Sequence, residues 1–247
     1  MTEPPAIVRY SMPHVDQAPD TPGLYAWYVS FRAGPHDWKL RAGKNGDEAT
    51  EGFLNLLRKY AGYYEPLPIN LSGRGSYGAR WQGEIALDSP LGPPDGPDAP
   101  TSVDAEDDTE AEAVLRLEKL MGSLDTENRR RVMSTILTQA IPVFSSPLYI
   151  GVAENLKQRL IQHRQKFTRA HDYLREHPQD ADAVRAHGRS FGERAAARNI
   201  AMEHLEAWVI DLGDEQNDEI TKKQLRNTAE SAEWLLHRLY SPILGRQ

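Results

Sequence analysis

A short apolar run passes directly into an amphipathic helix in the second half of the chain, and this junction limits the folds open to the sequence. Ser145-Ser146-Pro147 is typical of a turn, and residues 147–152 then predict a strand. Asn155 is placed to cap the following helix, with Gln158 three residues later as its capping-box partner. The helix is expected to run to about Phe167. Its predicted inward-facing residues are Leu156, Leu160 and Phe167.

An aromatic segment near the N-terminus predicts another strand. Residues 23–30 follow a Thr-Pro turn and read Gly-Leu-Tyr-Ala-Trp-Tyr-Val-Ser. Because side chains alternate along a strand, Tyr25, Trp27 and Val29 are expected on one face.

The last third of the chain predicts one more strand and a terminal helix. Residues 169–200 are polar and broken by Pro178 and Gly188, which favours one or two short helices with loops. Residues 205–212 predict the third strand. Apolar residues at helical spacing predict a helix from about 219 to 240, ending before Pro242.

These elements predict an α+β fold with a small mixed or antiparallel three-stranded sheet flanked by helices. The core is expected to comprise residues 1–31 and 147–247, and residues 32–146 form a largely helical insertion. Within the insertion, residues 38–87 are a candidate DNA-contact part with a helix over 51–60. Residues 88–108 hold five prolines and predict a flexible acidic loop. Residues 109–140 predict two helices that meet near Gly122-Ser123.

Composition narrows the class of protein. A chain of 247 residues that is 39% apolar can bury one core with a sizeable insertion. The absence of cysteine excludes disulfides and thiolate metal sites, so a metal would need carboxylate or imidazole ligands, which favours magnesium over zinc. No leader pattern and no run of eighteen apolar residues occurs, so we expect a soluble cytoplasmic protein with no membrane partner.

The acidic charge of the chain is concentrated in one segment. A net charge of −7 opposes nucleic-acid binding, because phosphate-binding proteins usually carry a basic surface. Residues 88–113, however, hold nine acidic residues and no Lys or Arg, and the rest of the chain has 29 basic and 27 acidic residues. Residues 154–175 contain six basic and two acidic residues. The local basic surface therefore coincides with the strand–helix junction.

Two motifs 124 residues apart suggest a family. Gly23-Leu24-Tyr25 lies on the first predicted strand and Tyr149-Ile150-Gly151 on the second, and Arg159 and His163 follow at a spacing of four on one helical face. Together they resemble the GIY-YIG nucleases over about 130 residues. The resemblance implies that the two motif strands pair as a hairpin, and the insertion lies where the family usually has a short connection.

The resemblance also implies roles for these residues. Tyr25 would accept a proton from the attacking water, Tyr149 would position water or phosphate, and Arg159 would contact the scissile phosphate. His163 matches a histidine that assists proton movement in some branches. A phenol is a poor base at neutral pH and needs a neighbouring cation that favours phenolate.

A single glutamate on a late helix would hold a divalent cation in such a nuclease. Glu233 precedes Pro242 by nine residues, the family spacing, and is preferred to Glu230, which stays the alternative. Gly245 stands where the family places an asparagine, which is a departure at this end of the chain.

Several other cations are candidate DNA-binding residues. The Gly73–Trp81 segment combines arginines with aromatic residues, which suits phosphate contact and base stacking, although an ordinary hairpin has the same composition. A run of arginines in the insertion suits phosphate binding or a solvated helix face. The candidates are Lys157, Arg164, Lys166, Arg74, Arg80, Arg129, Arg130 and Arg131.

We therefore expect a DNA endonuclease that uses Mg²⁺ or Mn²⁺, of the restriction or phage and mobile-element defence type, whose insertion supplies target recognition. Cutting both strands requires two active sites or two visits, and a homodimer would meet that requirement. The alternative is a catalytically inactive module of the same fold that binds nucleic acid or a protein.

Overall fold

The chain folds as two compact units in the computed structural model. The structure describes residues 6–34, 48–64, 69–74, 80–85, 118–213, 219–240 and 242–245. One unit comprises Met1–Ser30 and Ala140–Gln247, and the other comprises Phe31–Gln139. The boundaries between core and insertion that the sequence predicts lie after residues 31 and 146, whereas the boundaries between the two units lie after residues 30 and 139.

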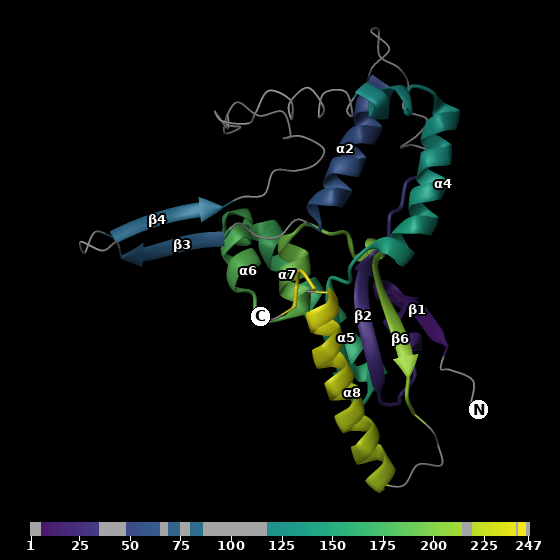
Figure 1. The fold of residues 1–247 in the computed structure, drawn as a ribbon, viewed down its shortest axis with the longest axis vertical. Coiled ribbons are helices and arrows are strands. Elements are labelled where there is room, and N and C mark those ends of the chain that lie inside the picture. The colour runs from purple at the N-terminus through teal and green to yellow at the C-terminus, as the bar shows by residue number, and fades with distance from the viewer. Residues whose placement is uncertain are drawn as a thin grey trace. The chain divides into compact units, whose positions relative to one another are not determined.

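The first unit contains a four-stranded antiparallel sheet in the order β1-β6-β2-β5 (Figure 1). Its strands are β1 (Ile7–Ser11), β2 (Gly23–Val29), β5 (Tyr149–Ala153) and β6 (Leu205–Asp211). The α+β class is confirmed, but the sheet has one strand more than the three predicted. The extra strand, β1, pairs with β6 at one edge, and its first three residues are exposed, so it lacks the alternation of a half-buried strand.

Strands β2 and β5 are neighbours despite their separation in the sequence. Tyr25 pairs with Gly151, and Trp27 pairs with Tyr149. Directly paired residues point to the same side of a sheet, so Tyr25, Trp27 and Tyr149 share one face. Burial alternates along β2 as predicted, with Tyr25, Trp27 and Val29 buried.

Helix α5 (Leu156–Glu176) follows β5 and covers that face. The Asn155 side chain accepts a hydrogen bond from the Gln158 backbone N–H at 2.8 Å, which confirms the predicted cap. The helix continues nine residues beyond Phe167, because no helix breaker occurs before Pro178. Its buried residues are Leu156, Leu160, His163 and Phe167.

Short helices pack on α5 before the chain returns to the sheet. The 3₁₀ helix η2 (Pro178–Asp180) leads into α6 (Ala181–His187) and then α7 (Phe191–Ala197). A capping box of Ser190 and Glu193 begins α7. A Cβ on Gly192 would lie 2.7 Å from the His163 carbonyl oxygen, so glycine allows α7 to approach the backbone of α5.

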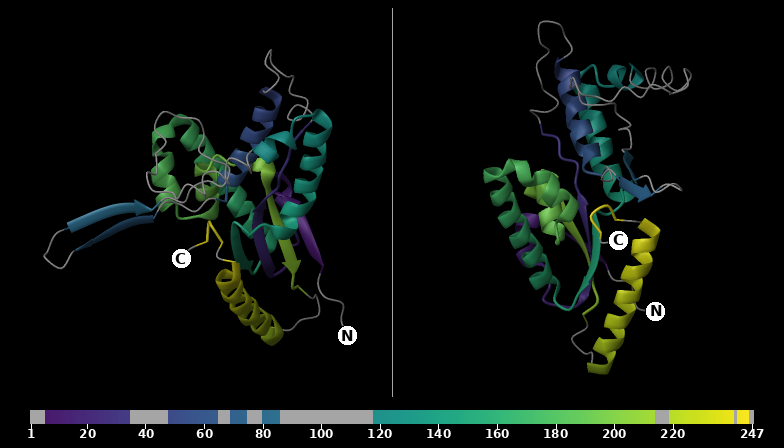
Figure 2. Two further views of the ribbon diagram at one scale, coloured as in Figure 1. Left: turned by 45° about the horizontal axis from the view of Figure 1, so that its top comes forward. Right: turned by 90° about the vertical axis from the view of Figure 1, so that its left-hand side faces the viewer.

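The C-terminal helix α8 (Glu219–Tyr240) has the predicted bounds and packs beside β5. The strands lie between α5 and α8 in the second view of Figure 2. Two further 3₁₀ helices, η1 (Met12–Gln17) and η3 (Met202–His204), lie against each other in this unit. Within the described part of the chain, no helix is long and apolar enough to span a membrane.

The described part of the second unit contains helices and a β-hairpin. Helix α2 (Glu48–Gly62) extends the predicted helix at both ends, and β3 (Ile69–Arg74) pairs antiparallel with β4 (Arg80–Ile85). A preceding helix ends at Gly122 and α4 (Glu127–Phe144) follows, which confirms two helices meeting near Gly122-Ser123. The predicted acidic loop, residues 88–108, lies outside the described residues.

The two ends of this second unit lie close together. The Thr138 hydroxyl donates a hydrogen bond to the Phe31 carbonyl oxygen at 3.5 Å. The unit therefore begins and ends at neighbouring points.

Candidate active site

Tyr25 lies at the centre of a buried hydrogen-bonded cluster. Its side chain is 1% exposed, and its hydroxyl lies 2.8 Å from Nε2 of His163. Nε of Arg159 donates a hydrogen bond to the same hydroxyl at 3.2 Å. The helical spacing of Arg159 and His163 thus brings both side chains to one atom of β2.

Tyr149 joins this cluster from the neighbouring strand. Its ring centroid lies 6.1 Å from that of Tyr25 and 5.6 Å from that of His163. Gly151, the pairing partner of Tyr25, leaves room for the hydroxyl, because a Cβ there would lie 2.7 Å from the Tyr25 oxygen. The glycine of the second motif therefore has a steric role in the site.

Burial keeps the two central groups neutral near pH 7. It raises the pKa of Tyr25 above that of an ordinary tyrosine, with a further increase from Tyr149 and an opposing effect of Arg159. Burial, followed by the nearby cations Arg159, Lys166 and Arg194, lowers the pKa of His163 to about 3. A phenol and an uncharged imidazole therefore face each other.

The proton positions in this pair depend on the His163 tautomer. When the Tyr25 hydroxyl donates to Nε2, the imidazole carries its own proton on Nδ1. Nδ1 is buried and has no hydrogen-bond partner among the described residues. A buried unpaired N–H destabilises a fold, so this histidine is poorly explained as a purely structural residue.

Helix α8 brings Glu233 and His237 to the free edge of β5. Nε2 of His237 lies 3.2 Å from the Ile150 carbonyl oxygen and 3.7 Å from Oε1 of Glu233. The Val152 backbone N–H is hydrogen bonded to Glu233. These contacts occupy polar groups that an edge strand would otherwise leave unpaired, and they fix the carboxylate beside the cluster.

Glu233 and Glu230 differ in their partners. Burial raises the pKa of Glu233, and nearby Glu230 adds to this effect, whereas His237, Val152 and Arg159 oppose it. Glu230 instead forms an ion pair with Arg226 at 2.8 Å, and Arg226 also contacts Glu154. Glu233 is thus the more enclosed carboxylate and the one near Arg159.

A cavity of about 620 Å³ opens over this cluster. Tyr149, Arg159, His163, Glu230 and Glu233 line it, whereas Tyr25 lies behind these residues and is not part of the wall. The expectation that Tyr25 contacts the attacking water directly therefore lacks a geometric basis. The Tyr25 hydroxyl instead contacts His163 and Arg159, which do line the cavity.

The donors in this cavity suit a hard cation bound through few protein ligands. No group of three or more His, Cys, Asp or Glu suited to a metal occurs among the described residues. Mg²⁺ commonly uses one or two carboxylates and takes its other ligands from water and substrate phosphate. Glu233, with Glu230 in the same wall, fits that pattern and does not fit a closed zinc site.

The predicted DNA-binding cations on α5 separate into two groups. Lys166 lines the cavity. Lys157 instead pairs with Asp20 at 3.3 Å, and Arg164 donates to the Pro13 carbonyl oxygen at 2.7 Å. These last two are not part of the cavity wall and serve contacts within the fold.

The arginine run of the second unit is mainly engaged within that unit. Arg130 is 4% exposed and donates to the Leu124 carbonyl oxygen, so its guanidinium forms a contact inside the unit and not on a phosphate-binding surface. Arg129 pairs with Asp125, and Arg131 donates to Asn128. Arg74 pairs with Arg80 in the backbone register of β3 and β4, and their side chains lie outside the described part of the structure.

Several residues of the cavity were not predicted from the sequence. His237 lies four residues after Glu233, and that helical spacing could have identified it. The capping box at Ser190 marks the start of α7, which contributes part of the wall, but nothing in the sequence indicates that α7 meets α5 here. The unpredicted lining residues are Gln162, Arg189, Ser190, Phe191, Arg194, Trp234 and His237.

Comparisons with models of protein families, with curated proteins and with solved structures find no match to this chain.

Proposed function

We propose that this protein is a metal-dependent DNA endonuclease of the GIY-YIG type. The observation that carries the proposal is the convergence of Tyr25, Tyr149, Arg159, His163 and Glu233 from β2, β5, α5 and α8 around one cavity. These residues are distant in the sequence, and a purely structural cluster would not require a phenol, an imidazole, a guanidinium and a carboxylate at one opening.

Basic side chains in the cavity wall would bind the phosphate of the substrate. Arg159 and Lys166 line the wall from α5, and Arg194 lines it from α7. A guanidinium stabilises the negative charge that develops on phosphate during hydrolysis. Arg194 also donates to the Gly188 carbonyl oxygen at 2.9 Å, which fixes its position in the wall.

The buried cluster provides a path for the proton of the attacking water. Tyr149 lines the cavity and interacts with Tyr25, which in turn contacts His163. We propose that water gives a proton to Tyr149 as Tyr149 passes its own proton to Tyr25, and Tyr25 passes its proton to Nε2 of His163. The products of this transfer are hydroxide and an imidazolium.

Bound substrate favours this transfer. Part of the lowered pKa of His163 comes from Arg159, Lys166 and Arg194. An anionic phosphate held by these cations offsets their effect, so His163 becomes more basic when the substrate is present.

A divalent cation would be held by Glu233, and when bound it supplies further stabilisation of charge on the phosphate. DNA is the proposed substrate, in a restriction or defence role. Target recognition is assigned to the unit of residues 31–139, since the cavity unit offers only a small surface for reading bases.

The proposal is tested by cleavage of plasmid and single-stranded DNA with Mg²⁺ or Mn²⁺. Arg159→Gln is expected to lower kcat/KM by about 10²–10³-fold, because a phosphate-stabilising donor is lost. Arg175→Gln is the matched control on the same helix, since Arg175 is 68% exposed and does not line the cavity. Equal cleavage by wild type and Arg159→Gln would overturn the assignment.

The second candidate is an inactive module that binds nucleic acid. The burial and raised pKa of Tyr25 favour it, because such a phenol gives up its proton with difficulty. Binding of DNA by the wild type without cleavage of DNA or RNA in either metal would establish this alternative.

A further inference from the structure

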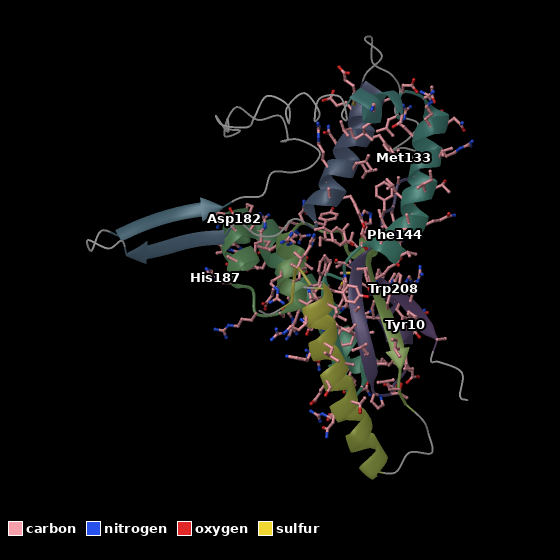
Figure 3. All side chains as sticks on the ribbon, viewed as in Figure 1. Tyr10, Met133, Phe144, Asp182, His187 and Trp208 are labelled. Carbon is pink, nitrogen blue, oxygen red and sulfur yellow. The ribbon has the colours of Figure 1, made fainter. Side chains whose placement is uncertain are left out.

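A second cavity of about 730 Å³ lies beside the first, between α5, α6 and α7. This volume is within the range of pockets that bind small organic ligands, and the pocket is an open groove, since its wall residue Tyr173 is 46% exposed. Figure 3 labels Asp182 and His187 on α6, and of these two residues His187 lines the cavity. The apolar part of the wall comes from Ala170, Tyr173, Leu174, Ala183 and Val184.

The two acidic residues of this wall already have partners. Asp180 accepts a hydrogen bond from the Tyr173 hydroxyl at 2.6 Å. Glu193 accepts hydrogen bonds from the backbone N–H groups of Arg189 and Ser190 at 2.7 and 3.0 Å. Both carboxylates are therefore already hydrogen bonded within the fold.

The basic residues of the wall favour an anionic ligand. Lys166 and Arg169 form no ion pair within the described part of the chain, and Arg189 also lines the cavity. An apolar pocket bordered by cations suits a ligand with a flat apolar part and a phosphate. Tyr173 offers an aromatic surface at this wall, and its ring stacks with that of His177 at a centroid distance of 4.4 Å.

Lys166 and Arg189 line both cavities. A ligand that spans the two would therefore place negative charge between these residues. We propose that the second cavity binds one nucleotide of the substrate strand, with its base against the apolar wall and its phosphate between Lys166 and Arg189. This inference rests on the proposed function, because it assumes that the substrate strand also passes through the first cavity.

A base in this cavity has left the duplex stack. The proposal therefore defines the substrate class as single-stranded nucleic acid, or nucleic acid with an unpaired nucleotide beside the cut. Stacking and apolar contact of one base contribute about 1–3 kcal/mol in single-strand binding, which corresponds to a change in Kd of roughly 5- to 150-fold.

The test compares dAMP with deoxyribose 5-phosphate, which has the phosphate and sugar but no base. Isothermal titration calorimetry on the full chain, without divalent metal, is expected to give dAMP an at least fivefold lower Kd. Ala183→Trp fills the apolar wall and should abolish this preference. Ala186→Trp is the matched control, because Ala186 is exposed on the same helix and does not line the cavity.

Equal affinity of the two ligands, or a preference that survives Ala183→Trp, would overturn the proposal. The strand assignment is tested by competition, since dAMP should weaken binding of a single-stranded (dA)₁₀ oligonucleotide. A dAMP site that does not compete would be a separate nucleotide site and would overturn the strand assignment.

Failure of the proposed function has a different signature. A chain that prefers dAMP and yet cleaves nothing would refute hydrolysis and retain the nucleotide cavity. A chain that cleaves DNA without a dAMP preference would refute only the cavity.

Discussion

His163 is neutral in the folded protein, and this has a consequence for stability against acid. Its folded pKa is about 3, below the value near 6.5 of an unfolded histidine, so the unfolded state binds more protons as the pH falls between these values. Stability is fully present above about pH 6.5 and is lost progressively toward pH 3. Between these pH values the free energy of unfolding falls by up to about 1.4 kcal/mol per pH unit.

The prediction is checked by urea unfolding at pH 7.5 and pH 4.5. Wild type should lose on the order of 2 kcal/mol more than His163→Gln over this interval. His171→Gln serves as the control, because His171 is a half-exposed histidine of the same helix. Parallel losses in wild type and His163→Gln would contradict the assignment of a neutral buried imidazole.

Glu230 is expected to affect the acid dependence of the proposed activity through Glu233. The pKa of Glu233 is raised by burial and by Glu230, and the ionised form is the one that binds a cation. Glu230→Gln should therefore shift the acidic limb of the kcat/KM–pH profile to lower pH, whereas Glu233→Gln should abolish metal-dependent activity. Glu154→Gln removes the other acidic partner of Arg226 and should leave the limb in place. If Glu230→Gln left the acidic limb unchanged, the proposed effect of Glu230 on the ionisation of Glu233 would be refuted.

At the residue level, the sequence predicted which groups meet in the candidate site but not how they are arranged. The spacing of Arg159 and His163 placed them on one face of α5, and strand alternation placed Tyr25 on the inner face of β2. Neither pattern shows that Tyr25 is enclosed behind Tyr149 and His163. Phe191 of α7 packs against Tyr149 and His163, and the sequence does not indicate this contact between distant segments.

Among the elements, α7 approaches the backbone of α5 closely at His163. A Cβ at Gly192 would lie 2.6 Å from the Phe167 backbone nitrogen and 2.7 Å from the His163 carbonyl oxygen. Both neighbours are backbone atoms that cannot rotate away. Gly192→Ala is therefore expected to destabilise the fold by about 1–3 kcal/mol and to lower activity.

Chemical denaturation and cleavage rates measure this effect. Gly122→Ala provides the comparison, since Gly122 is helical and its added Cβ would meet nothing within 4 Å. That substitution should be neutral or stabilising by about 0.4–1 kcal/mol. If both alanine variants gained stability, the close contact of α7 with α5 would be refuted.

The elements found from the sequence are those with a regular apolar period. Strand β2 and helix α8 have such a period, and their predicted bounds differ from the structure by one residue or less. Strand β1 escaped prediction because its apolar residues Ile7 and Val8 are adjacent and exposed. The end of α5 was placed too early, although Phe167, Ala170 and Leu174 continue its helical spacing toward the breaker at Pro178.

At the scale of the whole molecule, the residues of the proposed site all belong to one unit, Met1–Ser30 with Ala140–Gln247. Replacing residues 31–139 with a short Gly/Ser linker should therefore leave a folded unit. The close ends of the removed unit make such a linker long enough. Cooperative thermal unfolding followed by circular dichroism checks the fold.

The shortened chain should still cleave short oligonucleotides and should lose discrimination among target sequences. Tyr25→Phe in the same shortened chain provides the inactive control, because it removes the hydroxyl shared by His163 and Arg159. A shortened chain that is unfolded would show that the unit of residues 31–139 is required for the stability of the other.

The pairing of Trp27 with Tyr149 across about 120 residues also determines how the protein can fold. Closing a flexible loop of that length costs about 3 kcal/mol more conformational entropy than closing a four-residue turn. Early folding of the intervening unit would remove much of this cost, because its own ends then lie at the Phe31–Thr138 contact. The order of folding that follows is insertion first and β2–β5 pairing second, so the tyrosine cluster would be among the last parts of the chain to form.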